Sequence, residues 1–291
     1  MVGDALSRPV GFVLGGGGSL GASQVGMLQA LAEHHVAADL VVGSSIGSLN
    51  GAIVALDPGE AADILSHAWA RITRDMVFPG GLLAQARTLR RTRTHLFPSS
   101  GLAAVIASVL GAAASFAELA VPFGAVTTDI AAGQPYVITS GPLLPALLAS
   151  AAIPAIYPPV DHDGRHLYDG GLTANVPMRQ ALAMGARSLV VLDCTFPGHL
   201  PPLPETAADA ILYTALVTMR TQAVLEAPIA AATVPVVYLP GPSLRRISPL
   251  DFRNTDALAG EAYSAARQFL QKVRIDGPGL YGSPAGRCGQ P

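Results

Sequence analysis

The pentapeptide Gly43-Ser-Ser-Ile-Gly47 constrains this chain more than any other feature, because it directly follows the apolar run Leu40-Val-Val42. A G-x-S-x-G pattern at the end of an apolar strand is typical of a sharp strand-to-helix turn that exposes its central serine. The two glycines carry no Cβ, so they leave room for the helix to cross close over the strand. The pattern predicts that Ser45 is presented on this turn and that Ser44 points away from it. By itself, it also fits an ordinary glycine-rich helix start.

Two further glycine-containing motifs accompany this turn. The stretch Gly15-Gly-Gly-Gly-Ser-Leu-Gly21 lies one predicted helix upstream, and Asp169-Gly-Gly171 lies well downstream. Backbone N–H groups between a strand and a helix N-terminus favour negative charge, which suits the oxyanion formed when an ester is attacked. The N–H groups concerned belong to Gly16, Gly17 and Gly18. Asp169 ends a predicted strand, so the turn can aim its carboxylate as a base, although Asp-Gly is also a common ordinary turn pair.

The composition indicates one folded α/β domain. Half of the 291 residues are hydrophobic and only 13% are charged, which allows a sizeable core. The net charge of −2 argues against a nucleic-acid partner, because binding to duplex DNA needs a concentrated basic face. Cys194 and Cys288 lie far apart and form no C-x-x-C pair, which argues against a disulfide scaffold or a zinc site.

We expect neither a signal peptide nor a membrane-spanning helix. The first ten residues contain an acid and a proline where a signal peptide needs a basic start and an apolar run. Residues 101–120 are mostly alanine, whereas a spanning helix needs about 20 strongly apolar residues, so we expect a helix packed on the protein. These features predict a cytoplasmic location. They leave open both peripheral contact with a membrane surface and the oligomeric state.

The order of predicted elements is that of a mostly parallel sheet with right-handed crossovers. Strands are predicted at residues 11–14, 40–42, 123–126, 135–138, 165–168, 188–192 and, last, 234–239; helices are predicted at 19–33, 46–56, 143–150 and 257–272. Asn175 is placed to cap a helix that begins near Pro177. Residues 1–275 are interpreted as one domain, and the Gly/Pro-rich segment 276–291 as a disordered tail.

Residues 61–115 look helical and less regular, and they hold an arginine cluster. The cluster consists of Arg87, Arg90, Arg91 and Arg93. It is interpreted first as a solvated helix face, and second as a rim that attracts anionic headgroups.

The motifs allow two other interpretations. Gly16, Gly18 and Gly21 also fit the dinucleotide fingerprint G-x-G-x-x-G, which requires an acidic residue at the end of the next strand. That strand ends in Gly43-Ser-Ser45, so nucleotide binding is a weak second interpretation. A serine triad would require a histidine, but none of the seven lies in a sequence signature that marks it as catalytic. They are His34, His35, His67, His95, His162, His166 and His199.

Taken together, the motifs resemble the patatin-like phospholipase family. The resemblance rests on Gly15–Gly21, Gly43–Gly47, the run Ala149-Ser-Ala-Ala-Ile-Pro-Ala-Ile-Tyr-Pro-Pro159 and the run Asp169-Gly-Gly-Leu-Thr-Ala-Asn-Val-Pro177. The four motifs occur in the family's order, and the resemblance covers about residues 9–272.

The resemblance implies a three-layer α/β/α fold and hydrolysis of acyl esters of lipids by a Ser–Asp dyad, without a histidine, a metal or a cofactor. By motif position, Ser45 is the nucleophile, Asp169 is the base and the Gly16–Gly18 amides form the oxyanion hole. The remaining motif glycines would support these groups; they are Gly21, Gly43, Gly47, Gly170 and Gly171. The expected partner is a lipid or another acyl ester.

The chain departs from the family's pattern at Leu20, where the family usually has Arg or Lys. The departure puts in doubt a contact with an anionic headgroup, so neutral acylglycerols or simple esters gain weight as substrates. Two rival functions stay open. One is a catalytically silent lipid- or protein-binding module on the same fold, and the other is a conventional Ser-His-Asp esterase that uses His199.

Overall fold

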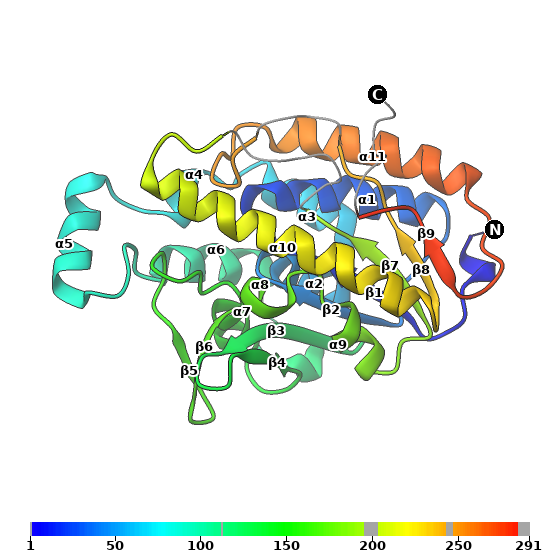
Figure 1. Ribbon diagram of the computed structural model, residues 1–291, viewed down its shortest axis with the longest axis horizontal. Coiled ribbons are helices and arrows are strands. Elements are labelled where there is room, and N and C mark those ends of the chain that lie inside the picture. The colour runs from blue at the N-terminus through cyan, green and yellow to red at the C-terminus, as the bar shows by residue number, and fades with distance from the viewer. Residues whose placement is uncertain (1, 112, 195–202, 243–246, 285–291) are drawn as a thin grey trace.

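A nine-stranded mixed sheet forms the middle layer of the molecule (Figure 1). The computed structural model describes residues 2–111, 113–194, 203–242 and 247–284. The strands are β1 (Val10–Leu14), β2 (Leu40–Ser44), β3 (Phe123–Asp129), β4 (Gln134–Ile138), β5 (Val160–His162), β6 (Arg165–Asp169), β7 (Ser188–Leu192), β8 (Pro235–Tyr238) and β9 (Gly279–Tyr281). They lie in the order β5-β6-β3-β2-β1-β7-β8-β9, and β4 pairs with the other edge of β3.

Six strands, from β3 through β2, β1, β7 and β8 to β9, run parallel. Every residue of β1, β2 and β7 is buried, as expected for apolar strands covered on both faces. Successive residues alternate between the two faces: Phe12 and Leu14 pack on one side of the sheet, and Val13 packs on the other.

Helices cover both faces and complete three layers. They are α1 (Ala22–Glu33), α2 (Ile46–Leu56), α3 (Ala61–Trp69), α4 (Arg74–Val77), α5 (Leu82–Thr92), α6 (Ser100–Leu110), α7 (Leu143–Ser150), α8 (Gly171–Ala174), α9 (Met178–Ala183), α10 (Ala207–Ala231) and α11 (Thr255–Lys272). Three short 3₁₀ helices are η1 (Gly3–Ala5), η2 (Gly18–Gly21) and η3 (Phe116–Glu118). Helices α1, α2, α3, α6, α7 and α11 pack in one core, and α9 and α10 pack in a second core across the sheet. Within the described part of the chain, no helix has the length and hydropathy needed to cross a membrane.

The predicted elements are found, with differences at the C-terminal side. The 25-residue helix α10 was not predicted from the sequence. Its apolar and polar residues are distributed on all sides of the helix, so no amphipathic pattern marks it. The predicted helix in residues 101–120 ends at Leu110. The prediction of a disordered tail is wrong for Gly279–Tyr281, which forms β9 and pairs in parallel with β8. That pairing depends on a partner strand far away in the sequence, so local Gly/Pro content does not report it. Residues 285–291 lie outside the described residues.

The register of β3 brings two distant segments together. β4 occupies one edge of β3 along its length, so β2 and β6 share the other edge. On that edge, Ser44 at the end of β2 lies opposite Val126, and Asp169 at the end of β6 lies opposite Thr127. The two strands therefore meet end to end at consecutive positions of β3, which places Asp169 beside the turn that carries Ser45.

Candidate active site

Ser45 lies on a strained turn between β2 and α2. Its backbone has φ 53° and ψ −128°, a conformation that side-chain-bearing residues rarely adopt and that costs about 1–3 kcal/mol. A Cβ on Gly43 would come within 2.2 Å of the Gly47 carbonyl oxygen, and one on Gly47 would come within 2.2 Å of the Leu14 carbonyl oxygen. Glycine is thus required at both positions by the close approach of α2 to the sheet, as the motif predicts.

Ser150, the last residue of α7, ties this turn to the sheet. Its hydroxyl accepts a hydrogen bond from the Ser45 N–H at 3.0 Å and donates one to the Val126 carbonyl at 2.6 Å. Its own carbonyl accepts a 3.3 Å bond from the N–H of Gly170. Ser150 is fully buried. No role for Ser150 is predicted from the sequence, although it belongs to the run 149–159 on which the family resemblance partly rests.

Asp169 is a buried carboxyl group with an incomplete set of partners. Its Oδ1 accepts a hydrogen bond from the Gly171 N–H at 2.7 Å. Burial raises its pKa to about 6, and the nearby Ser45 hydroxyl and the Gly171 N–H reduce the rise in pKa. Its Oδ2 is buried and has no hydrogen-bond partner among the described residues. Unpartnered buried oxygens are rare and often mark functional sites.

The glycine loop after β1 adjoins Ser45. A Cβ on Gly16 would lie 3.0 Å from the Cβ of Ser45, so this loop and Ser45 are in direct contact. The Gly16 N–H, however, donates to the Asn175 carbonyl at 3.1 Å and is not available to an oxyanion. The N–H groups of Gly17 and Gly18 donate no hydrogen bond within the part of the chain that the structure describes. Of the three predicted oxyanion-hole residues, only Gly17 and Gly18 therefore have a backbone N–H group available to an oxyanion.

Asn175 does not cap the helix predicted near Pro177. Pro177 itself occupies the N-cap position of α9, with no side-chain cap. Asn175 instead donates from Nδ2 to the Gly16 carbonyl at 3.4 Å, in addition to accepting the Gly16 N–H. A tertiary partner has replaced the local one, so Asn175 supports the glycine loop.

A buried chain of amide groups also fixes the glycine loop. Gln24 donates to the carbonyls of Gly15 and Leu192, at 3.0 and 2.9 Å. Asn50 donates to the Gly21 carbonyl at 3.0 Å and to the Gln24 side chain at 2.7 Å. At Gly21, a Cβ would come within 2.5 Å of the Ile46 side chain, so the loop packs directly on the start of α2.

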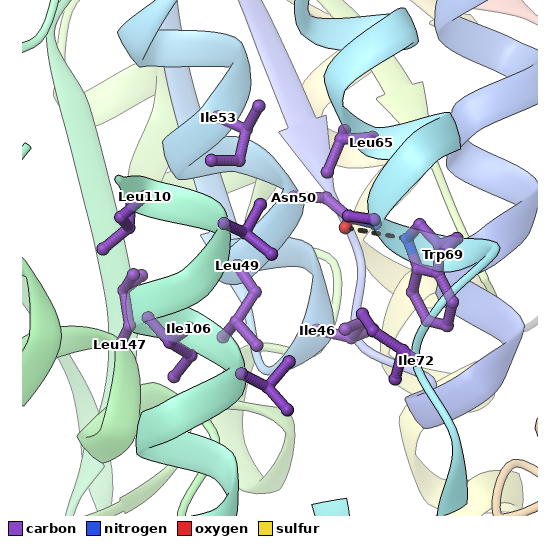
Figure 2. A pocket seen from close by; sticks show the side chains of 13 residues that line it. Ile46, Leu49, Asn50, Ile53, Leu65, Trp69, Ile72, Ile106, Leu110 and Leu147 are labelled. Atoms are coloured by element: carbon purple, nitrogen blue, oxygen red, sulfur yellow. Dashed lines mark hydrogen bonds between the residues drawn. The ribbon is translucent and has the colours of Figure 1, made fainter. Parts of the chain in front are cut away.

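An apolar cavity opens beside the residue that follows Ser45 (Figure 2). It is partly open to solvent and lies between α2, α3, α6 and α7. Its walls include Ile46, Leu49, Ile53, Leu65, Ile106 and Leu147. The Trp69 indole N–H donates to Asn50 Oδ1 at 3.2 Å, which links this wall to the amide chain under the glycine loop.

Further residues singled out in the sequence are Gly170, Leu20 and the histidines. A Cβ on Gly170 would come within 2.3 Å of the Val126 carbonyl oxygen, so this glycine permits the contact between β6 and β3. Leu20 is only 5% exposed and packs in the core, so in this chain its side chain makes no contact with a headgroup. Among the described residues, no histidine is hydrogen-bonded to Ser45 or Asp169, and no three potential metal ligands gather at one place. His199 lies outside the described residues.

Comparisons with known proteins show the family of the chain. The model of the patatin-like phospholipase family matches residues 12–182, which is more than half of the chain. "Patatin-like phospholipase domain-containing protein 7" of Mus musculus is 34% identical over 189 residues, covering 63% of this chain and 13% of that protein. "Lysophospholipase NTE1" of Mycosarcoma maydis is 31% identical over 193 residues, covering 63% of this chain and 10% of that protein.

Among solved structures, VipD from Legionella pneumophila is similar at 13% identity and a TM-score of 0.49, covering 91% of this chain and 67% of that chain. This three-layer α/β/α chain, with its serine on a strand-to-helix turn, belongs to the patatin-like phospholipase family. It spans only about an eighth of the length of the animal relatives it matches.

Proposed function

We propose that this protein is a serine hydrolase of lipid acyl esters that works through a Ser45–Asp169 dyad. The main support is the register of β3, along which β2 and β6 meet end to end, together with the buried Oδ2 of Asp169, which has no hydrogen-bond partner among the described residues. A carboxyl group with a pKa of about 6 is largely ionised at neutral pH, yet it is a stronger base than an ordinary aspartate.

In the first step, the Ser45 Oγ attacks the ester carbonyl carbon while its proton passes to Asp169. The negative charge that develops on the carbonyl oxygen is stabilised by the N–H groups of Gly17 and Gly18, next to the N-terminus of a short helix. The tetrahedral intermediate collapses, the C–O bond to the alcohol breaks, and Asp169 returns the proton to the leaving oxygen. Water then attacks the acyl-enzyme with Asp169 again as base, which releases the fatty acid and restores Ser45.

The cavity between α2 and α6 suits the acyl chain of the substrate. Its apolar walls begin at Ile46, the residue after the nucleophile, so a chain bound there would hold its ester carbonyl near Ser45. The relatives include proteins called lysophospholipases, which makes a phospholipid-derived ester the leading substrate class. A peripheral position at a membrane surface follows as part of the same proposal.

The direct test is labelling with a fluorophosphonate probe, together with hydrolysis of p-nitrophenyl esters of increasing chain length. Wild-type protein should be labelled on Ser45, and Ser45→Ala should lose both labelling and hydrolysis. Ser48→Ala is a suitable control, because Ser48 is a buried serine on the next turn whose hydroxyl donates to the Ser45 carbonyl. Folded wild-type protein that is neither labelled nor active would favour the silent lipid- or protein-binding module instead.

A further inference from the structure

Helix α5 presents its apolar side chains to solvent instead of to the protein. Leu82 is 83% exposed, Leu83 is 89% exposed and Leu89 is 43% exposed. The half-buried side of the helix is polar and consists of Gln85, Thr88 and Thr92, which are spaced by three and four residues. No residue of α5 is buried. This is the reverse of a surface helix that packs on its own domain, which turns its apolar stripe inward.

The charge on α5 has one sign and is not neutralised. No Asp or Glu occurs between Met76 and Ala117, and four arginines lie in that stretch. None of these arginines forms an ion pair within the part of the chain that the structure describes. The chain as a whole has a net charge of −2, whereas this stretch carries positive charge without any acidic residue. The arginines are Arg87, Arg90, Arg91 and Arg93.

The position of α5 relates it to the active site. In Figure 1 the helix projects from the end of the molecule at which α10 and α11 begin. These helices follow the parallel strands β7 and β8, so that end carries the carboxyl ends of the strands, where Ser45 also lies. Further exposed apolar residues belong to elements near this end; among them are Met76 in α4 and Ile211 near the start of α10, which are 43% and 73% exposed.

We propose that α5 is the docking helix by which this protein binds an anionic lipid surface, with its leucines in the acyl boundary and its arginines on lipid phosphates. Exposed leucines beside unpaired arginines are the combination by which interfacial helices bind bilayers. The inference rests on the proposed function for its choice of occupant, because a lipid-ester hydrolase needs its site to face the lipid. It deepens that function by naming the surface that faces the bilayer.

The test measures cosedimentation of Ser45→Ala protein with vesicles of phosphatidylcholine, with and without phosphatidylglycerol. This background keeps the lipid intact and separates binding from hydrolysis. The double variant Leu82→Ser/Leu83→Ser should lower partitioning at least tenfold on vesicles of both compositions. The triple variant Arg87→Gln/Arg90→Gln/Arg91→Gln should abolish the preference for phosphatidylglycerol and the dependence on salt.

The matched control is Leu225→Ser/Ile229→Ser. These residues of α10 are 64% and 57% exposed but lie near the end of that helix farthest from α5, so partitioning should not change (Figure 1). Equal partitioning of all variants would overturn the proposal. So would leucine variants that change self-association but not vesicle binding, because α5 would then pair with a second copy. Fluorophosphonate labelling of the same variants in the wild-type Ser45 background reports separately on the active site.

Discussion

The Ser45 turn and helix α5 lie at the same end of the molecule, but opposite physical constraints shape them. Around Ser45, backbone atoms touch so closely that Gly43 and Gly47 admit no Cβ. On α5, Leu82 and Leu83 touch almost nothing of their own chain. The first region specifies its residues through the fold of this chain. In the second region, packing within the chain does not require the residues that occur there. The proposed lipid surface would account for them instead.

The largest effect is expected at Asp169, the proposed general base. Asp169→Asn keeps the shape and the Gly171 contact but cannot accept the Ser45 proton, so kcat should fall about 10²–10⁴-fold. In the wild type, kcat/KM should rise with pH through about 6, the pKa of Asp169, and then level off. Ester hydrolysis measured between pH 4 and 9 checks both results. Each histidine replaced by alanine is the control; a folded histidine variant as inactive as Ser45→Ala would establish a triad instead.

The next largest effect is expected at Gly47, where α2 packs closely against the end of β1. Gly47→Ala places a Cβ 2.2 Å from the Leu14 carbonyl oxygen, so the free energy of unfolding should fall by about 3 kcal/mol or more. Gly260→Ala is the matched control, because its Cβ meets nothing within 4 Å in the middle of α11. It should stabilise the protein by about 0.5–1 kcal/mol. Urea unfolding measures both; equal effects would mean that the turn is less constrained than the structure indicates.

Ionised Asp169 should also destabilise the fold. Its carboxyl group releases its proton near pH 4 when unfolded and at about pH 6 when folded, so the folded state holds more protons in between. Stability from this group is therefore full below pH 4 and declines as the pH rises to 6, by about 3 kcal/mol in total. Asparagine does not ionise, so the free energy of unfolding of Asp169→Asn should be higher than that of the wild type at pH 8 but not at pH 4. Chemical unfolding at the two pH values decides; a variant less stable at pH 8 contradicts the assignment.

A smaller effect is expected at Ser150. Ser150→Ala leaves the Ser45 N–H and the Val126 carbonyl without their shared partner, which should cost about 1–3 kcal/mol of stability and also lower kcat. Ser188→Ala is the matched control, because that hydroxyl is equally buried yet has no hydrogen-bond partner in the described structure. It should change stability and kcat little. Thermal unfolding and ester hydrolysis of both variants would show whether Ser150 positions the turn.

The smallest effect is expected on α5. Leu82→Ser and Leu83→Ser should each change the free energy of unfolding by less than about 0.5 kcal/mol and leave hydrolysis of soluble esters intact. Leu143→Ala, at a fully buried leucine of α7, should instead cost about 2–5 kcal/mol. A large loss of stability at Leu82 would place α5 with the folded core and remove the contrast between the two regions.

The local motifs were predictable because each is a backbone requirement written in neighbouring residues. The glycines around Ser45 predict a turn, and the apolar run before them predicts a strand. The aspartate before two glycines predicts a second turn. None of these predictions depends on which distant residues the segment contacts. The glycine loop was predictable for the same reason, but its hydrogen bonds were not: Asn175 was expected to cap a helix and instead occupies the Gly16 N–H. Local patterns indicate which groups are exposed on a turn, not which distant group binds them.

The sequence by itself thus determined the family, the mostly parallel sheet and the candidate dyad. Only the tertiary structure decided that β2 and β6 share one edge of β3, that Ser150 joins them, and that Leu20 is buried in the core. It also decided that α5 turns its leucines outward and that Gly279–Tyr281 adds a strand to β8. The physical reason is that strand register, burial and hydrogen-bond partners depend on segments far apart in the chain, whereas turn and helix signals depend on adjacent residues.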